Sequence, residues 1–382
     1  MKNTIKMSLV AAVTVAGLTT TASADTLQEA FAASKIKGEL KSQYFTKDTE
    51  SGADSSIWVN GGNISVTTGS YYGLTAGVTF QTSHVATVDG TGYAGDMDAS
   101  GSVMSESYLA YKINNTSAKL GRQYISTPLV ASSGSRMIKT SFEGIVLANT
   151  DIANTTLVAA YADKAAYRTD GDGDVDGFNA IADGAYTIYA KNTSVNNLTL
   201  TAQYAQIQEA SANAGEDVNV LFIDAGYKLD MVKLSAEYLD SDNGQDTDSS
   251  GTLYGMKADA NIKGISLTAA YTTTNDEAAV IRGLGAGAFP GYAKLTIGAG
   301  AKSYTADTDS YMVKAGYAIA GVSVGVGYAN YDDNSADMRY TETELKAGYK
   351  FNKNLSANIV YASFGGDDTK DYNFRSYLSY KF

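Results

Sequence analysis

Apolar and polar side chains alternate with a period of two through most of the chain from residue 35 onward. Clear examples are the segments 196–206, 231–239, 265–271, 322–328 and 355–361. A period of two puts successive side chains on opposite faces of a β-strand, so each segment has one apolar face. That face repeatedly ends on a tyrosine, which suits a boundary between lipid and water because its ring is apolar and its hydroxyl is polar. The pattern predicts an all-β protein.

After residue 25 no second apolar run reaches the roughly 20 residues that a spanning helix needs. In lipid, backbone polar groups must be paired within the protein, so only helices and closed barrels cross a membrane. The chain has 28 Tyr, 38 Gly, 2 Pro and no Cys, which favours strand-rich surfaces without disulfides. We therefore expect a transmembrane antiparallel β-barrel. A soluble β-sandwich or β-solenoid is the alternative, but such folds use shorter strands or a fixed repeat.

The first 24 residues have the pattern of a signal peptide for export. Lys2 and Lys6 supply positive charge, residues 7–18 are apolar, and residues 22–24 read Ala-Ser-Ala before a cleavage point at Asp25. We therefore expect a signal peptide over 1–24, a short periplasmic segment over 25–34 and a barrel domain over 35–382.

Short and long connections alternate between the predicted strands. The short ones are polar and lie at 114–116, 192–197, 229–231, 263–264, 320–321 and 352–354, whereas 82–102, 163–184 and 240–251 are long and rich in Asp, Gly and Ser. This asymmetry is typical of outer-membrane barrels. Counting strands gives about 18, with nine external loops and both ends on the short-turn side, and 16 is the alternative. The apolar stretch from Leu295 to Ala301 would break the even number, so we assign it to the long loop spanning Asn275 to Asp309.

One block of sequence resembles a known family. It reads Gly121-Arg122-Gln123, then Thr127-Pro128-Leu129, Ser135-Arg136-Met137 and Phe142-Glu143-Gly144. This block resembles OprD-type outer membrane porins, in which it carries the third loop into the pore. The strand count independently makes residues 126–141 the third long loop, so we expect a constriction there. The final strand, 371–382, ends on Phe382 and is similar to the signature that the outer-membrane assembly machinery recognises on bacterial porins.

The resemblance implies a water-filled channel in the outer membrane of a Gram-negative bacterium, through which ions and small hydrophilic solutes diffuse passively. The alternatives are a substrate-specific channel for organic acids or amino acids, and an adhesin or structural barrel whose loops bind surfaces. OprD-type barrels are often monomers and general porins usually trimers, so either state is open. Outer-membrane lipid and lipopolysaccharide are the expected neighbours.

Charged residues of the third loop are the first candidate site. Arg136, Lys139 and Glu143 would place opposite charges across a narrow passage, which orients dipolar solutes and sets ion preference. A simpler possibility is that Arg136 and Glu143 pair to hold the loop. Arg122 has the parity of outward-facing Leu120, so it would face the pore only through a bulge.

Charges on the pore wall are the second candidate set. By alternation the inward-facing ones are Lys191, Asp224, Glu237, Lys257, Lys314, Glu344, Lys346, Lys350 and Arg375. Most of the basic residues are lysines, which bind carboxylates less directionally than arginines do. We therefore expect general or mildly selective diffusion.

The net charge limits the partners. The chain has 29 basic and 41 acidic residues, a net charge of −12. Removing Lys2 and Lys6 with the signal peptide leaves 27 basic residues, and 27 minus 41 gives about −14. Such acidity argues against nucleic acid as a partner and predicts a weak preference for cations.

A third candidate site is an Asp-rich stretch in the fourth long loop. Asp172, Asp174, Asp176 and Asp183 occupy positions one, three, five and twelve of an EF-hand-like calcium loop, with Gly177 at position six. Position twelve is Asp rather than Glu, and no flanking helix is expected. No cofactor is required, so calcium in this loop is the only candidate.

An enzymatic barrel is the rival function from another class. Outer-membrane proteases and phospholipases depend on histidine, and the only histidine of this chain is His84. No Ser or Asp motif around it assigns a catalytic role, so we expect no enzyme.

Overall fold

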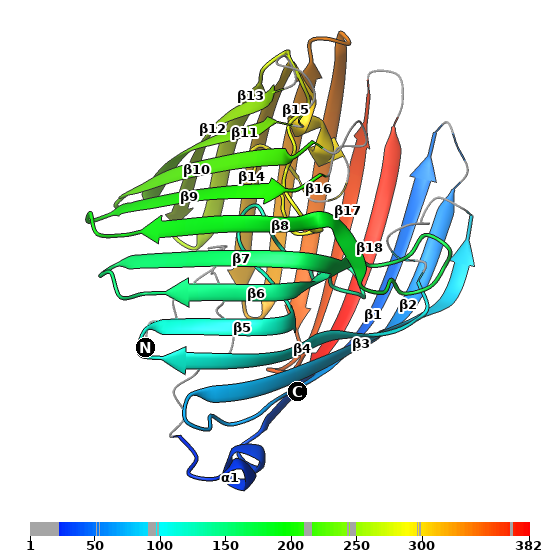
Figure 1. Ribbon diagram of the computed structural model, residues 1–382. Coiled ribbons are helices and arrows are strands. Elements are labelled where there is room, and N and C mark those ends of the chain that lie inside the picture. Colours follow the sequence, from blue (N-terminus) through cyan, green and yellow to red (C-terminus); the bar gives the residue numbers. More distant parts are fainter. Residues whose placement is uncertain are drawn as a thin grey trace.

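The computed structural model describes residues 23–50, 52, 54–90, 97, 99–209, 216–242, 244, 250–295, 297, 299–366 and 370–382. The signal peptide expected over 1–24 therefore lies outside the described residues, apart from Ser23 and Ala24. The described chain forms one antiparallel sheet of 18 strands that closes on itself, because β1 pairs with both β2 and β18 (Figure 1). The predicted transmembrane barrel of about 18 strands is confirmed.

The strands follow one another around the barrel in chain order. They are β1 (Lys35–Thr49), β2 (Ser55–Thr67), β3 (Leu74–Asp89), β4 (Gly101–Ile113), β5 (Thr116–Gln123), β6 (Ser141–Asn149), β7 (Thr155–Ala166), β8 (Asn179–Asn192), β9 (Leu198–Ile207), β10 (Val218–Leu229), β11 (Val232–Asp242), β12 (Ser250–Ile262), β13 (Ile265–Thr274), β14 (Thr308–Ile319), β15 (Val322–Asp333), β16 (Met338–Lys350), β17 (Leu355–Gly365) and β18 (Asp371–Lys381).

The alternation in the sequence becomes an apolar outer wall. In β15, Val322, Val324 and Val326 are exposed on the outside, and Leu345 of neighbouring β16 continues the band. Lipid rather than water covers such a band in a membrane barrel. Among the described residues, no helix is both long and apolar enough to serve as a membrane span.

The turns at one end of the barrel are tight. Lys263 and Gly264 have φ of 51° and 87°, and Ala320 and Gly321 have φ of 49° and 86°. Two successive residues with positive φ suit a two-residue hairpin, because the twist of that turn matches the twist of the strands. The predicted short connections at these positions are confirmed.

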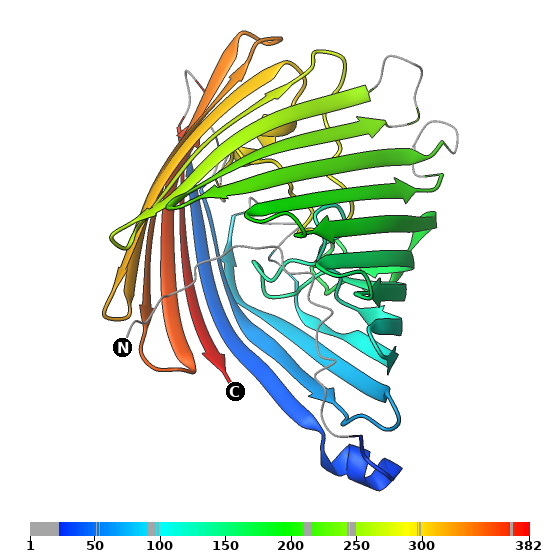
Figure 2. The same ribbon diagram turned by 90° about the vertical axis from the view of Figure 1, so that its left-hand side faces the viewer.

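The nine connections at the other end are numbered L1 to L9 in chain order. Two of them fold back into the barrel, namely L3 (residues 124–140) and L7 (275–307), which contains the short helix η1 (Ala299–Tyr304). Both loops are visible inside the barrel when it is turned by 90° (Figure 2). The entry of L3 was predicted from the family resemblance, whereas L7 was expected only as a long loop.

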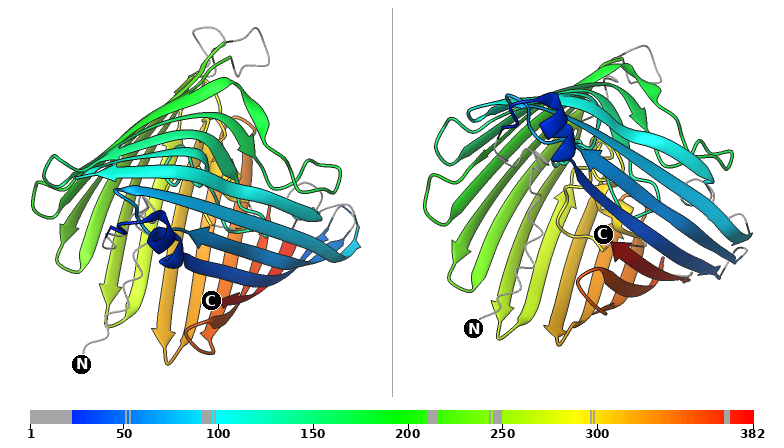
Figure 3. Two further views of the ribbon diagram at one scale, coloured as in Figure 1. Left: turned by 60° about the horizontal axis from the view of Figure 1, so that its bottom comes forward. Right: turned by 90° about the horizontal axis from the view of Figure 1, so that it is seen from below.

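The segment 25–34 contains a helix that was not predicted, α1 (Leu27–Ala32). Thr26 Oγ1 accepts a hydrogen bond from the Glu29 N–H, and the Glu29 carboxylate accepts one from the Thr26 N–H, so the helix starts with a complete capping box. Gly69 in the β2–β3 turn donates its N–H to the Ala30 carbonyl. The helix therefore packs at the short-turn end of the barrel, close to the start of β1 (Figure 3).

Candidate constriction and pore wall

L3 is fastened to the inner wall through its backbone. Buried Gln203 of β9 accepts the Leu129 N–H at 2.9 Å and donates to Thr127 Oγ1 at 2.7 Å. Gln81 of β3 exchanges two hydrogen bonds with the backbone of Lys139, at 2.9 and 3.0 Å. Lys41 Nζ of β1 donates to the Arg136 carbonyl at 2.8 Å. Opposite sides of the wall thus hold L3, so its path across the lumen is defined.

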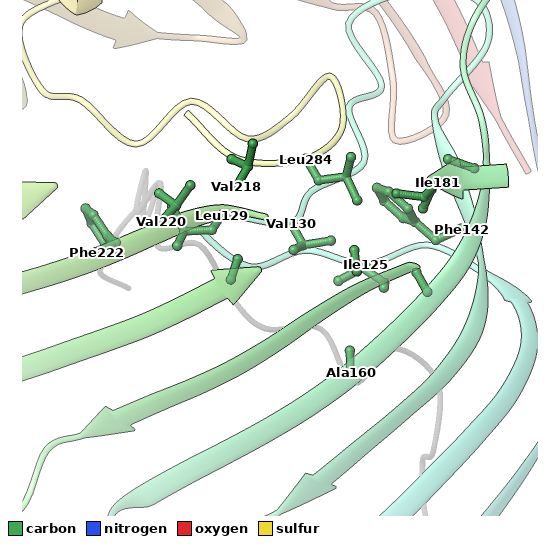
Figure 4. Close-up of a cluster of buried hydrophobic side chains, with 14 of the residues drawn as sticks. Ile125, Leu129, Val130, Phe142, Ala160, Ile181, Val218, Val220, Phe222 and Leu284 are labelled. Atoms are coloured by element: carbon green, nitrogen blue, oxygen red, sulfur yellow. The ribbon is translucent and has the colours of Figure 1, made fainter. Parts of the chain in front are cut away.

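The first half of L3 is packed by apolar side chains. Ile125, Leu129 and Val130 are at most 5% exposed and belong to one cluster with wall residues of β7 to β10 and with Leu284 of L7. Figure 4 shows these L3 side chains gathered with the wall residues Val218 and Val220 and with Leu284 of L7. This part of L3 is closed to water, and apolar burial is the main stabilising contribution there.

The second half of L3 carries cations. Lys139 Nζ lies 3.8 Å from the centre of the Tyr124 ring, and the Arg136 guanidinium lies 5.3 Å from the Phe45 ring. Arg375 of β18 lies 4.8 Å from the same Phe45 ring. Aromatic faces attract cations electrostatically, so these rings hold the charges in place. Burial lowers the pKa of Lys139, and the nearby Glu106 carboxylate partly opposes that shift.

The acid that acts on Lys139, Glu106, already has other partners. Glu106 Oε1 of β4 lies 3.2 Å from Lys119 Nζ, and Glu106 Oε2 accepts the Thr79 hydroxyl at 2.8 Å. The Tyr124 N–H also donates to Glu106. One carboxylate therefore lies beside two lysines, Lys119 and Lys139, so these three side chains together carry a net positive charge.

Glu143 does not lie in the constriction. It shares a face of β6 with Ile145 and Leu147, both exposed on the outside of the barrel. Arg122 Nε donates to Glu143 Oε2 at 2.8 Å, and Lys164 Nζ lies 3.6 Å from Oε1. The prediction of Glu143 as a pore residue, and as a partner of Arg136, is therefore wrong. The side chains of β6 alternate between the two faces of the barrel wall from the first residues of the strand. Glu143 therefore points outward, as Arg122 does in β5.

L7 is fastened to the wall mainly by carboxylates. The Tyr292 hydroxyl donates to Asp224 of β10, and the Tyr292 N–H donates to Glu237 of β11 at 2.6 Å. Further along, the Ile297 N–H donates to Glu342 of β16 at 3.3 Å. The Leu295 N–H donates to the Tyr331 hydroxyl at 3.2 Å. L7 therefore spans the lumen from β10 to β16.

L7 also contains a buried lysine. Lys294 Nζ donates to the Phe289 carbonyl and, at 2.8 Å, to the Tyr304 hydroxyl. Burial lowers the pKa of Lys294 well below its usual value, although Glu237 opposes the shift. Burial likewise raises the pKa of Tyr304. The charge of Lys294 is thus used within L7 itself.

The structure places the wall charges on the lumen side of their strands, next to outward apolar neighbours such as Met256, Val313 and Leu345. These are Lys191, Asp224, Glu237, Lys257, Lys314, Glu344, Lys346, Lys350 and Arg375. Some are paired: Lys346 lies 2.5 Å from Glu344, and Lys257 lies 3.8 Å from Asp259 and 4.0 Å from the Tyr292 ring centre.

The Asp-rich stretch of L4 (residues 167–178) is not gathered into a calcium loop. Asp176 is buried and accepts the Tyr167 N–H at 2.9 Å and the Asn179 amide at 2.8 Å. Residues 173–175 pair instead with Ser100 of L2. Among the described residues, which include Asp172, Asp174, Asp176 and Asp183, no cluster of three or more acidic, His or Cys side chains could hold a metal. The EF-hand-like interpretation is corrected, because a loop without flanking helices is folded by its neighbours.

Sequence reasoning missed two groups of residues near the constriction. Lys41 has inward parity in β1 and could have been found by alternation. Arg168, which donates to Ser135 Oγ at 3.0 Å, comes from the start of L4 and carries no period-two signal. The sequence gives no signal for Tyr292 and Lys294 of L7 either, because an irregular loop has no periodicity that indicates which way a side chain points.

Comparison with known proteins assigns the family. Residues 10–369 match the model of the Gram-negative porins. The chain belongs to the Gram-negative porin family. This porin therefore resides in the outer membrane of a Gram-negative bacterium, where it forms a channel for passive diffusion of small solutes and ions. No curated protein matches the chain in sequence.

Solved structures share the fold of this porin at low identity. OccK3 (OpdO) of Pseudomonas aeruginosa has a TM-score of 0.75 and 17% identity, over 93% of this chain and 97% of that one. OccAB4 of Acinetobacter baumannii has a TM-score of 0.74 and 16% identity, over 91% and 98%. OpdK of Pseudomonas aeruginosa, solved with vanillate, has a TM-score of 0.74 and 12% identity, over 92% and 99%. The resemblance to OprD-type porins is confirmed at the level of fold.

Proposed function

We propose that this porin passes small solutes bearing a carboxylate faster than neutral or cationic solutes of the same size. The observation that carries the proposal is the cationic half of L3. Its backbone is held by Lys41 and Gln81, while Arg136 and Lys139 lie against aromatic rings at the narrowed part of the lumen. Fixed cations in a narrow passage favour an anionic group in transit.

One structural relative was solved with a solute of this class. OpdK was solved with vanillate, which carries a carboxylate on an aromatic ring. At 12% identity the likeness reaches the fold alone, so the support for this chain comes from its own residues. Lysine is a less directional partner for carboxylates than arginine. The proposed preference is therefore for a chemical class rather than for one compound.

The proposal departs from the expectation based on net charge. The whole chain is acidic, with a net charge of −12, and this led us to expect a weak cation preference. Some of the acids are engaged within their own external loop, as in L4, where Asp170 accepts the N–H groups of Asp172 and Asp174. Screening by salt limits their influence to roughly 10 Å at 0.1 M ionic strength. The charges at the narrowest part should therefore dominate selectivity.

The proposal can be tested by uptake into liposomes containing the purified porin. Benzoate, benzamide and benzylammonium have similar size and differ in charge, so they form a matched series. We expect benzoate to enter fastest. In a planar bilayer with a salt gradient, we expect the reversal potential to have the sign that indicates anion selectivity. Equal rates, or fastest entry of benzylammonium, would contradict the proposal. A barrel without conductance would instead favour the adhesin or structural alternative.

The proposal includes no catalytic step. His84 is exposed on the outward face of β3, away from the lumen. The proposed partners besides solutes are lipid, lipopolysaccharide and the assembly machinery, which would recognise β18 and Phe382. In the barrel Phe382 exchanges two backbone hydrogen bonds with Gly38, at 3.0 and 3.1 Å. Cross-linking in native membranes would separate a monomer from a homotrimer.

A further inference from the structure

A short stretch of L7, residues 283–287, lies directly on the backbone of L3. The Leu284 N–H donates to the Leu129 carbonyl at 2.8 Å, and the Ala131 N–H donates to the Leu284 carbonyl at 3.0 Å. The Gly287 N–H donates to the Ala131 carbonyl at 2.9 Å. Two loops about 150 residues apart in sequence thus pair like parallel strands inside the lumen.

The contact is so close that it requires glycine at alternate positions. A Cβ atom on Gly283 would lie 2.2 Å from the Leu129 carbonyl oxygen, and one on Gly287 would lie 2.4 Å from that of Ser132. On Gly285 it would lie 2.5 Å from the Ala131 carbonyl oxygen and 2.7 Å from the Phe142 ring. Carbon atoms do not approach backbone oxygens so closely, so any side chain here must separate the two loops.

Leu284, between Gly283 and Gly285, holds L7 in place on L3 through its side chain. Leu284 is 7% exposed and points into the apolar cluster with Leu129 and Val130 (Figure 4). On its other side this part of L3 rests on the wall, where Leu129 is fully buried. L3 therefore lies between the wall and L7 and has no room to retreat, because protein interiors are close-packed.

We propose that Gly283, Gly285 and Gly287 are positioning residues that set the width of the passage. They allow L7 to lie at backbone distance from L3, which keeps L7 out of the remaining lumen. A methyl group on this strip cannot displace L3 into the wall, so it must push L7 toward the passage. The inference concerns the width of the channel and is independent of the solute preference proposed above.

Single-channel recording of the Gly287→Ala porin in a planar bilayer tests this inference. Gly287 has no left-handed φ, so the substitution adds a methyl group without backbone strain. We expect a lower unit conductance and the loss of a single, quiet open level. Two variants are matched controls, Gly177→Ala and Gly171→Ala in L4, because a Cβ at either position meets nothing within 4 Å. Gly171 has a φ of 92°, so its variant also controls for backbone strain.

A second variant covers the case in which Gly287→Ala does not assemble, which a heat-modifiability gel would reveal. Leu284→Ala adds no atom and weakens the same pairing by removing a packed side chain. We expect a noisier open level from it, since L7 is then held less firmly against L3. Wild-type conductance and noise in Leu284→Ala, together with wild-type behaviour or failed assembly of Gly287→Ala, would overturn the inference.

Discussion

L3 and L7 both enter the lumen, but they are fastened in different ways. L3 is held by amide and lysine side chains of the wall, with Gln81 and Gln203 bound to its backbone. L7 is held by the wall carboxylates Asp224, Glu237 and Glu342. The wall thus uses two amides and one lysine where it holds the cationic loop, and acidic groups where it holds the loop with a buried lysine.

This difference separates two tasks within one constriction. Because the neutral amide of Gln81 binds only the backbone of Lys139, the Lys139 ammonium keeps its charge and lies over the Tyr124 ring. Because L7 (residues 275–307) has three acidic and three basic residues, that loop adds bulk to the lumen and little net charge. Charge preference should therefore respond to changes in L3, whereas the width of the passage should respond to changes in L7.

The largest expected effect comes from removing the side chain that anchors L3. Gln203→Ala leaves the buried Leu129 N–H without its acceptor, which costs about 2 kcal/mol of unfolding free energy. Urea unfolding of the porin in lipid vesicles, followed by the fluorescence of Trp58, measures this loss. On the same strand Gln206 has outward parity and donates to Asp217, at 2.8 Å near the surface, so Gln206→Ala should change stability by less than about 0.5 kcal/mol. Equal losses in both variants would contradict the assigned role of Gln203.

A smaller loss is expected from weakening the anchor of L7. Tyr292→Phe removes the hydroxyl that donates to Asp224 and keeps both the ring and the N–H bond to Glu237. We expect a cost of about 1 kcal/mol in the same urea experiment, since one hydrogen bond is lost and another remains. Tyr254→Phe, on the outward face of β12, is the control. A loss larger than that of Gln203→Ala would reverse the ranking of the two anchors.

Ion selectivity sharpens the comparison further. Lys139→Gln should shift the reversal potential in a salt gradient toward the value of a cation-selective channel. The shift should correspond to a change of less than about 1 kcal/mol in the free energy of an anion in the passage, because water there screens the charge. Lys294→Met should leave the reversal potential unchanged, since Lys294 is bonded inside L7. If the two variants shift it equally, the proposed division between the loops fails.

The smallest expected effect is a pH dependence of that selectivity. The pKa of Lys139 is lowered, so its charge is lost at lower pH than that of an ordinary lysine as pH rises. Anion preference should therefore decline as pH rises, and this decline should begin at a lower pH than the titration of ordinary lysines. Lys139→Arg should not show the decline, because arginine stays protonated. An identical decline in both proteins would assign it to other lysines.

Most of the barrel could be predicted from sequence because strand alternation is local. The segments ending on Tyr238 and Tyr328 show which faces meet lipid, and their number gives 18 strands. The same logic contradicts Glu143 as a pore residue once its parity with Ile145 is followed. Asp172 and its neighbours show the limit of a spacing motif, since spacing alone does not bring side chains together.

The sequence by itself determined the closed barrel, its lipid-facing band and the alternation of short turns with long loops. These follow from a period of two and from the need to pair every backbone group in a membrane. Only the tertiary structure decided that L7 lies on L3, that Gly287 permits the contact and that Tyr292 ties L7 to the wall. Those contacts join residues far apart in an irregular chain, where no periodicity links a position to a direction.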